Sequence, residues 1–202
     1  MNSRIPINLA VEDDLSEAVL RKLLPAKYTV GVCYKKRGFG YLKKNIRGFN
    51  NAAKGMPFLV LTDLDREECP PKLIKEWLSV STQHHNLLFR VAVREVESWV
   101  LADRDHFAKF LGIKKEQVPP KVDDIAHPKK CLIDLATKSR KRRLQEDIVP
   151  TRGSTAKQGP NYNGRLISFV EKVWNPNEAM HSSPSLRRAI KAVKKFQPKW
   201  EK

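Results

Sequence analysis

The amino-acid sequence predicts an α/β fold, with a Rossmann-like, mostly parallel sheet flanked by helices and a helical extension at the C-terminal end. Four short apolar runs have strand character, at residues 7–11, 28–34, 58–62 and 87–93. Segments with helical spacing of apolar residues separate these runs, and such alternation is typical of βαβ units with parallel strands. The alternation stops near residue 105. We therefore expect an α/β domain at residues 1–104 and a basic, mainly helical region at residues 105–202 packed on it.

The first strand, Ile7–Val11, ends in Glu12-Asp13-Asp14, and apolar residues with helical spacing follow it. Asp14 and Glu17 have the spacing of a capping box, with Asp14 as the N-cap of this helix and Glu17 as its N3 residue. Capping does not require Glu12, which is the first polar residue beyond the strand. Glu12 is therefore a candidate functional carboxylate.

The second strand, residues 28–34, is followed by a basic loop that contains glycine. Lys35, Lys36 and Arg37 lie in this loop, and Phe39 is its aromatic residue. Such a loop can follow a phosphate backbone while the ring stacks on a base, so we interpret its cations as nucleic-acid contacts. The alternative is a solvated turn.

The third strand begins at Phe58 and ends on two carboxylates, Asp63 and Asp65, that one residue separates. In an extended chain these side chains point to the same side, about 6.6–6.8 Å apart. They are then placed to share one hydrated Mg²⁺ ion or to hold two neighbouring ions. The alternative is an aspartate-rich turn at the end of a strand.

The fourth strand, residues 87–93, leads into the segment Arg94–Asp103, whose Val96 and Trp99 would anchor a short helix to the core. Glu97 lies on a neighbouring face of this helix. Considered alone, Glu97 would be an i,i+3 partner of Arg94. Because three strands are then followed by acidic residues, Glu97 becomes a candidate metal ligand.

The other helices follow from apolar periodicity and are expected at residues 41–54, 70–78, 106–111, 129–138, 166–174 and 185–196. The helix at 70–78 begins with two prolines, and the last helix has Ser183 as N-cap and Pro184 at its first position. The run at residues 138–143 has the densest positive charge of the chain. We interpret four of its cations as nucleic-acid contacts, with a solvated face as the alternative: Arg140, Lys141, Arg142 and Arg143.

The composition indicates a polyanionic partner. Among 202 residues, 39 Lys and Arg oppose 22 Asp and Glu, which gives a formal net charge of +17. This excess favours nucleic acid, DNA before RNA, over a membrane, since no apolar run approaches the ~20 residues that a membrane span needs. Three cysteines without zinc-site spacing argue against a disulfide framework, and no signal-peptide segment is evident, so we expect a cytoplasmic protein.

The carboxyl ends of parallel strands meet at one edge of a sheet, so Glu12, Asp63, Asp65 and Glu97 are expected to converge there. Carboxylates gathered in one place repel one another unless cations neutralise them. Oxygen ligands suit Mg²⁺ or Mn²⁺, and we expect two such ions. Metal ions in this setting activate water and stabilise the leaving oxygen of a phosphodiester.

The sequence resembles the Toprim domain of topoisomerases, primases and OLD-family nucleases over residues 5–103. The resemblance is carried by Val11-Glu12 after a first strand, Asp63-Leu64-Asp65 after a third, and the acidic helix start at Arg94–Trp99. It is strongest for the stand-alone, OLD-like Toprim proteins, which often accompany an ABC-type ATPase in prokaryotic antiphage systems. The resemblance implies a Mg²⁺- or Mn²⁺-dependent endonuclease that acts as the effector of such a system, with Glu12, Asp63 and Asp65 holding the catalytic metals.

Two further residues enter through the resemblance. The family usually places Gly directly after the first Glu and a second acid four residues on. Here Asp13 follows Glu12, and the matching acid, Glu17, is five residues on. Related nucleases also use a charge-stabilising cation, for which Lys157 in the polar stretch Thr151–Asn163 is the candidate.

Two other interpretations stay open. The chain could be a degenerate Toprim-like module that binds nucleic acid or a partner without cutting. It could also be a receiver-like switch in which Asp63 is phosphorylated and Asp13 and Asp14 bind Mg²⁺. A receiver needs a hydroxyl at the end of its fourth strand and Lys-Pro at the end of a fifth. The sequence shows neither, and its positive charge does not suit a receiver.

Overall fold

The computed structural model describes residues 4–35 and 39–200, apart from the side chain of Phe39. The nucleic-acid contacts expected at Lys36 and Arg37, and the stacking expected of Phe39, lie outside what is described. The chain divides into two compact units. The first comprises Met1–Val93 with Arg188–Lys202, and the second comprises Arg94–Arg187. This division differs from the expected boundary at residue 104, since the helix that carries Glu97 groups with the second unit.

The first unit contains a sheet of four parallel strands, which confirms the predicted α/β class. The strands are β1 (Ile5–Val11), β2 (Tyr28–Lys35), β3 (Phe58–Asp63) and β4 (Leu87–Ala92). Their spatial order is β2-β1-β3-β4. The chain passes from β1 to one neighbour and later returns to the other side of β1, so the strand order reverses between β1 and β3. Such a switch point is where open α/β sheets bind ligands, at the carboxyl ends of the strands.

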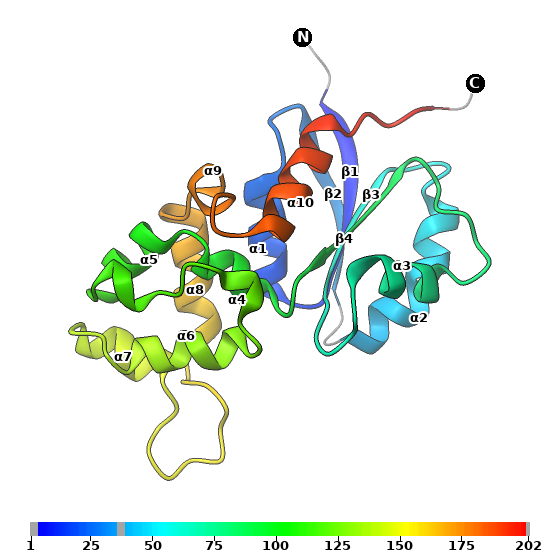
Figure 1. Ribbon diagram of the computed structural model, residues 1–202. Coiled ribbons are helices and arrows are strands. Elements are labelled where there is room, and N and C mark those ends of the chain that lie inside the picture. The colour runs from blue at the N-terminus through cyan, green and yellow to red at the C-terminus, as the bar shows by residue number, and fades with distance from the viewer. Residues whose placement is uncertain (1–3, 36–38, 201–202) are drawn as a thin grey trace. The chain divides into compact units, whose positions relative to one another are not determined.

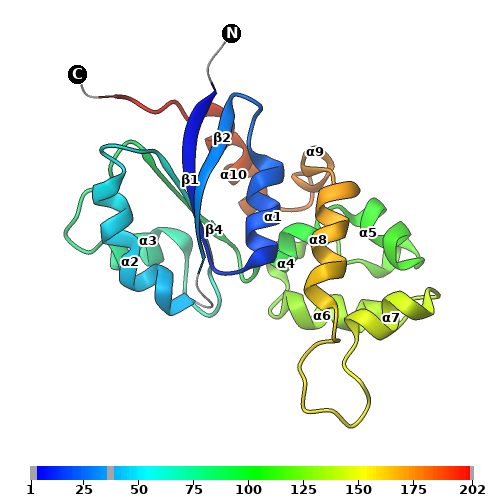
Figure 2. The same ribbon diagram turned by 180° about the vertical axis from the view of Figure 1, so that it is seen from behind.

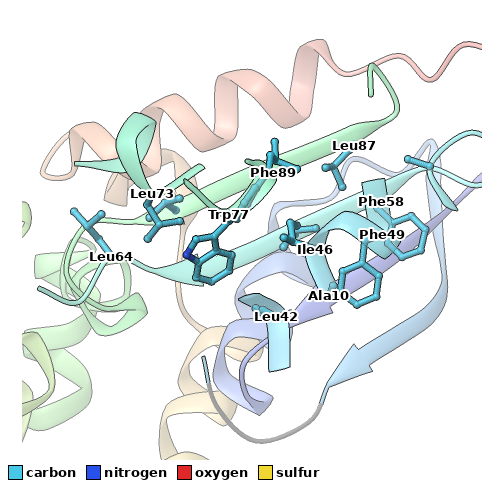
Figure 3. Close-up of a cluster of buried hydrophobic side chains, with 14 residues drawn as sticks. Ala10, Leu42, Ile46, Phe49, Phe58, Leu64, Leu73, Trp77, Leu87 and Phe89 are labelled. Carbon is cyan, nitrogen blue, oxygen red and sulfur yellow. The ribbon is translucent and has the colours of Figure 1, made fainter. Parts of the chain in front are cut away.

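Helices cover both faces of this sheet. Helices α2 (Phe39–Ala52) and α3 (Pro70–Leu78) lie on one face, and α1 (Asp14–Leu23) and the C-terminal half of α10 (Pro184–Lys195) lie on the other (Figures 1 and 2). Residues of α2 and α3 interlock with inward side chains of the strands, as Figure 3 shows for Ile46, Trp77 and Phe58. The central strands β1 and β3 are mostly apolar because both of their faces are covered, whereas β2, at one edge of the sheet, is largely exposed or half-buried.

The first turn of α1 corrects one prediction. The helix begins at Asp14, and its N-cap is Asp13, whose carboxylate accepts a hydrogen bond from the Ser16 amide at 2.8 Å. The predicted cap at Asp14 was therefore wrong by one residue. Both aspartates have the chemistry of a cap, and the hydrogen bond from the Ser16 amide identifies Asp13 as the one that caps the helix.

The second unit is helical. It contains α4 (Val96–Leu101), α5 (Arg104–Leu111), η1 (Lys115–Gln117), η2 (Val122–Asp124), α6 (Pro128–Ala136), α7 (Arg142–Ile148), α8 (Tyr162–Lys172) and α9 (Pro176–Ala179). Helix α4 contacts α5, α6, α9 and η2. Its buried Trp99 donates a hydrogen bond from Nε1 to Ser185 Oγ at 2.7 Å and accepts one at its carbonyl oxygen from Trp174 Nε1 at 3.1 Å. Within the described ranges, no helix is both long and apolar enough to cross a membrane.

The predicted start of the last helix is confirmed. Helix α10 begins at Pro184, and the Ser183 hydroxyl accepts a hydrogen bond from the Leu186 amide at 3.1 Å, as an N-cap does. The Asp123 carboxylate of η2 reinforces this turn because it accepts hydrogen bonds from Ser183 Oγ at 2.6 Å and from the Ser185 amide at 2.7 Å.

A bulge interrupts the pairing of β1 with β2. Ile7 pairs with Val30 but Leu9 pairs with Cys33, so Asn8 faces one extra residue of β2. The buried Asn8 side chain accepts a hydrogen bond from the Val32 amide at 2.9 Å, which satisfies a group that the bulge removes from the ladder. A Cβ added at Gly31 would lie 2.8 Å from Asn8 Oδ1, so the glycine leaves room for this contact.

We predict that the effect of Gly31→Ala on the free energy of unfolding depends on the residue at position 8. In the wild type it should lower the free energy of unfolding, because the new methyl group displaces the Asn8 side chain from the Val32 amide. In an Asn8→Ala background it should be neutral or stabilising by roughly 0.4–1 kcal/mol, because alanine reduces the freedom of the unfolded chain. Urea denaturation of the four proteins measures this coupling, and additive effects would contradict the role given to Asn8.

Candidate functional site

Glu12 lies at the switch point of the sheet, directly after β1. Thr62, near the end of β3, donates a hydrogen bond from Oγ1 to Glu12 Oε1 at 2.5 Å, and the Asp63 amide donates to the same oxygen at 3.0 Å. The register explains this contact. Ala10 pairs with Val60, so Glu12 and Thr62, each two residues further along, are neighbours on the same face. The Glu12 carboxylate therefore joins the ends of two parallel strands.

Asp63 and Asp65 flank Leu64, whose side chain is 2% exposed within the core cluster between the sheet and α2 and α3. The Leu64 amide donates to the Ala92 carbonyl at 2.9 Å, which extends the pairing of β3 with β4 by one residue. The chain then turns at Asp65, whose φ is 48°. The extended geometry assumed for the Asp63–Asp65 spacing thus ends at Asp63, where β3 ends.

The electrostatics of this edge are those of crowded acids. Burial raises the pKa of Glu12 above its ordinary value, and the Asp65 and Asp13 carboxylates raise it further, against the lowering effect of the hydrogen bonds from Thr62 and Asp63. Asp65 is an exposed residue, but the protein around its carboxyl group still raises its pKa, against the lowering effect of Arg66. A bound cation would relieve these costs, because it favours the ionised form of both acids.

The donor chemistry of this edge fits a hard cation. All the candidate ligands are carboxylates, and Glu12 Oε2 has no hydrogen-bond partner among the described residues. Across residues 4–35 and 39–200, no group of three or more His, Cys, Asp or Glu side chains is arranged to hold a metal ion. Mg²⁺ in phosphoryl-transfer sites commonly uses one or two carboxylates, with waters and substrate phosphates as its other ligands. The charge of Asp65 acts on Glu12 here, and that of Asp13 adds to it.

Glu17 and Lys35 are engaged with each other beside this edge. The Lys35 ammonium forms ion pairs with Glu17 at 2.8 Å and with Asp14, and Arg21 pairs with Glu17 at 2.8 Å. These partners lower the pKa of Glu17, against the raising effect of its burial, and raise that of Lys35. The metal-ligand role of Glu17 and the nucleic-acid contact of Lys35 stay predictions, and either role would require these ion pairs to open.

Glu97 belongs to α4 in the second unit, where it is 6% exposed. The Tyr162 hydroxyl of α8 donates a hydrogen bond to Glu97 Oε1 at 3.0 Å, and the Lys129 ammonium lies 4.9 Å from the centre of the Tyr162 ring. Glu97 is therefore held by residues of its own unit. Its place in the metal site stays a prediction.

Lys157 lies in the chain between α7 and α8, which Figure 1 draws in yellow. It is exposed and lines an open pocket of about 640 Å³. The pocket's other lining residues come from the start of α4 and from around α6: Glu95, His127, Lys129, Lys130, Ile133 and Asp134. Glu95 accepts a hydrogen bond from the Lys129 amide at 2.7 Å. The structure thus surrounds Lys157 with both cations and carboxylates.

The four cations of the basic run differ in their surroundings. Arg140 and Arg143 are exposed, and neither forms an ion pair within the described part of the chain. Lys141 donates hydrogen bonds to the carbonyl oxygens of Lys109 and Phe110, whereas Arg142 pairs with Glu146 at 2.9 Å. The structure therefore distinguishes cations that are already bound from cations that face solvent.

Thr62 is the site residue that the sequence reasoning missed. Its side chain is 1% exposed, and its hydroxyl fixes the orientation of Glu12. A signal was present, because Thr62 is the single hydroxyl in an otherwise apolar strand and precedes Asp63 directly. Because side chains alternate along a strand, Thr62 lies on the same face of β3 as Phe58 and Val60. Glu12 likewise continues the face of Ala10 on β1, and Ala10 pairs with Val60.

No family model, curated protein or solved structure matches this chain.

We predict opposite effects of two substitutions at Glu12 in the absence of divalent ions. Glu12→Gln keeps an oxygen that accepts from Thr62 and Asp63. Because burial raises the folded-state pKa of Glu12, ionisation opposes folding, and the wild type should lose stability relative to Glu12→Gln as the pH rises above 4.5 through the folded-state pKa. Glu12→Ala instead leaves the buried Thr62 hydroxyl without its acceptor, and should cost about 1–3 kcal/mol.

Urea denaturation of the three proteins across this pH range measures both effects. Glu12→Gln should be at least as stable as the wild type at neutral pH, and the difference between the two should shrink at low pH. A Glu12→Gln protein that is destabilised equally at every pH would contradict the assignment of a strained, ionised carboxylate.

Proposed function

We propose that this protein is a metal-dependent nuclease of the Toprim type that hydrolyses phosphodiester bonds of nucleic acid. One observation carries the proposal. At the switch point of a parallel sheet, Glu12 is fixed between two strand ends by Thr62 and Asp63, and Asp65 lies close enough to raise its pKa. Acids arranged in this way suit a cation, and this edge is where such sheets bind their ligands.

The residues of this edge have separable roles. The two hydrogen bonds to Glu12 Oε1 fix the orientation of the carboxylate and leave Oε2 to face a cation. Asp65 adds a second negative charge from the turn after β3, and Asp63 provides the amide that holds Glu12 together with a third carboxylate for the proposed cation. Bound Mg²⁺ or Mn²⁺ supplies water activation and stabilisation of the leaving oxygen. The protein contributes the preorganised charge, so no reorganisation is needed when the reaction occurs.

The choice of substrate rests on charge. A net charge of +17 draws a polyanion to the protein, while the acidic edge by itself repels phosphate. Cations from the metal site reconcile these features, since they neutralise the carboxylates and face the scissile phosphate. DNA as the substrate, an ABC-type ATPase as a partner and a role in antiphage defence are parts of this proposal that rest on the sequence resemblance.

We predict that Asp63→Ala and Asp65→Asn each reduce Mg²⁺- or Mn²⁺-dependent cleavage at least on the order of a hundredfold, because loss of a charge that positions a cation costs several kcal/mol of transition-state stabilisation. The measurement is cleavage of supercoiled, linear and single-stranded DNA by the purified protein. Glu68→Gln is the matched control, because Glu68 lies in the same connection after β3, is exposed and pairs only locally with Lys72 at 2.6 Å.

Three results would overturn the proposal. Full cleavage activity of the Asp63→Ala variant would show that this edge of the sheet is not the active site. Binding of DNA without any cleavage by the wild type would indicate a non-catalytic module. Stable labelling of Asp63 by acetyl phosphate, with Asp65→Asn behaving as the wild type, would indicate a phosphoacceptor.

A further inference from the structure

Two cations of the basic run are already occupied by the protein itself. Helix α5 ends at Gly112, whose φ of 70° is left-handed, and the last carbonyl groups of the helix need donors. Lys141 provides them, with its ammonium 2.9 Å from the Lys109 carbonyl oxygen and 2.8 Å from that of Phe110. Arg142 is paired with Glu146 one helical turn away. Lys141 is therefore engaged at the end of a helix, and Glu146 partly neutralises the charge of Arg142.

The neighbouring cations line a pocket. Lys138 and Arg140 face an open pocket of about 490 Å³, and Lys114 lies across from them after α5. The remaining wall consists of Gly112, Ile113 and Gln117, so no carboxylate lines it. None of the three cations forms an ion pair or a side-chain hydrogen bond with another described residue. Three positive charges without a neutralising partner around one pocket create a positive electrostatic potential that attracts an anion.

Gln117 adds a neutral donor to this wall. Its side-chain oxygen accepts a hydrogen bond from the Lys114 amide at 3.1 Å, which fixes the side chain and leaves its NH₂ group as a donor. No described residue accepts from that group. The pocket therefore offers charged and neutral donors together, the combination that binds phosphate oxygens.

Two other pockets of the second unit lack this character. The pocket beside Lys157 has Glu95 and Asp134 in its wall, and a smaller one of about 230 Å³ has Asp103, Asp105 and Glu178. Their carboxylates neutralise the cations beside them and repel an incoming phosphate. The pocket of Lys114, Lys138 and Arg140 stands apart from both because its charge has a single sign.

We propose that the pocket lined by Lys114, Lys138 and Arg140 binds a phosphate group of a nucleic-acid backbone, independently of base sequence. This inference rests on the proposed function, since its ligand is the proposed substrate. It changes the residues expected to contact nucleic acid, because it replaces Lys141 and Arg142 by Lys114 and Lys138. Arg140 is common to both sets, and the nucleic-acid contact of Arg143, which is exposed outside the pocket, stays a prediction.

The test compares two triple variants that lose the same charge. The pocket variant carries Lys114→Gln, Lys138→Gln and Arg140→Gln. The control carries Lys121→Gln, Arg152→Gln and Lys172→Gln, all exposed positions of the same unit outside the pocket. Binding of a short fluorescein-labelled DNA duplex is followed by anisotropy over a range of salt concentrations in EDTA, so that neither metal binding nor cleavage contributes.

The pocket variant should bind on the order of tenfold more weakly at 0.1 M salt, and its log–log salt slope should be smaller by about 0.9 for each phosphate that it no longer neutralises. The control should retain most of the affinity and slope of the wild type. Lys114→Arg combined with Lys138→Arg should bind as the wild type does, because charge and donors are kept. Melting temperatures of all variants identify any that fail to fold.

Equal reductions of affinity in the two triple variants would overturn the inference, since the pocket would then be one part of a diffuse positive surface. Unchanged DNA binding by the pocket variant, together with abolished binding to phosphatidylserine vesicles, would overturn it in favour of a lipid headgroup. Because the assay contains no divalent ion, its result is independent of the cleavage experiments. A protein that never cuts DNA but binds it through this pocket would refute the proposed activity and leave the pocket assignment intact.

Discussion

The two hydrogen bonds that Glu12 Oε1 accepts hold together the part of the sheet where strand order reverses. At a switch point the connections leave β1 and β3 in opposite directions, so the strand ends are not held together by a common loop. A carboxylate that bonds to a hydroxyl and an amide of the neighbouring strand supplies that link. The same contact orients Glu12, so local structure and the proposed chemistry depend on one side chain.

The fold was predictable where burial alone sets the pattern. Strands of a parallel sheet are mostly short apolar runs, and all four were located within two residues of their ends. Helix α7 was missed because it begins in the run of basic residues and has only two buried apolar positions, Leu144 and Ile148. The return of the chain end to the first unit was not predictable. It depends on distant contacts, such as the hydrogen bond from the Tyr28 hydroxyl to the Phe196 carbonyl at 2.5 Å, which leave no local pattern.

The candidate site was predictable in part for the same reason. Position after a strand identifies Glu12 and Asp63, since parallel strands bring their carboxyl ends together whatever their order. Sequence spacing could not show that Lys35 forms ion pairs with Asp14 and Glu17. It also could not show that Lys141 donates to the last carbonyl groups of a helix, because both contacts depend on how the elements pack. Charge counted along a chain overestimates the charge that is available to a ligand, and the difference appears only when partners are known.

Two energetically unfavourable features lie at the edge of the sheet that carries Glu12, a strained backbone at Asp65 and a buried carboxylate at Glu12. Folding stability alone would favour neither of them. Asp65 adopts a positive φ that costs of the order of 1–3 kcal/mol in residues other than glycine, and glycine there would relieve it. Glu12 has a raised pKa, and glutamine would keep its hydrogen bonds without the charge. A bound cation would lower the cost of both ionised carboxylates, as the proposed metal site requires. The positive φ of Asp65 is a backbone cost that a cation would leave unchanged, and it belongs to the turn from which the Asp65 carboxylate acts on Glu12.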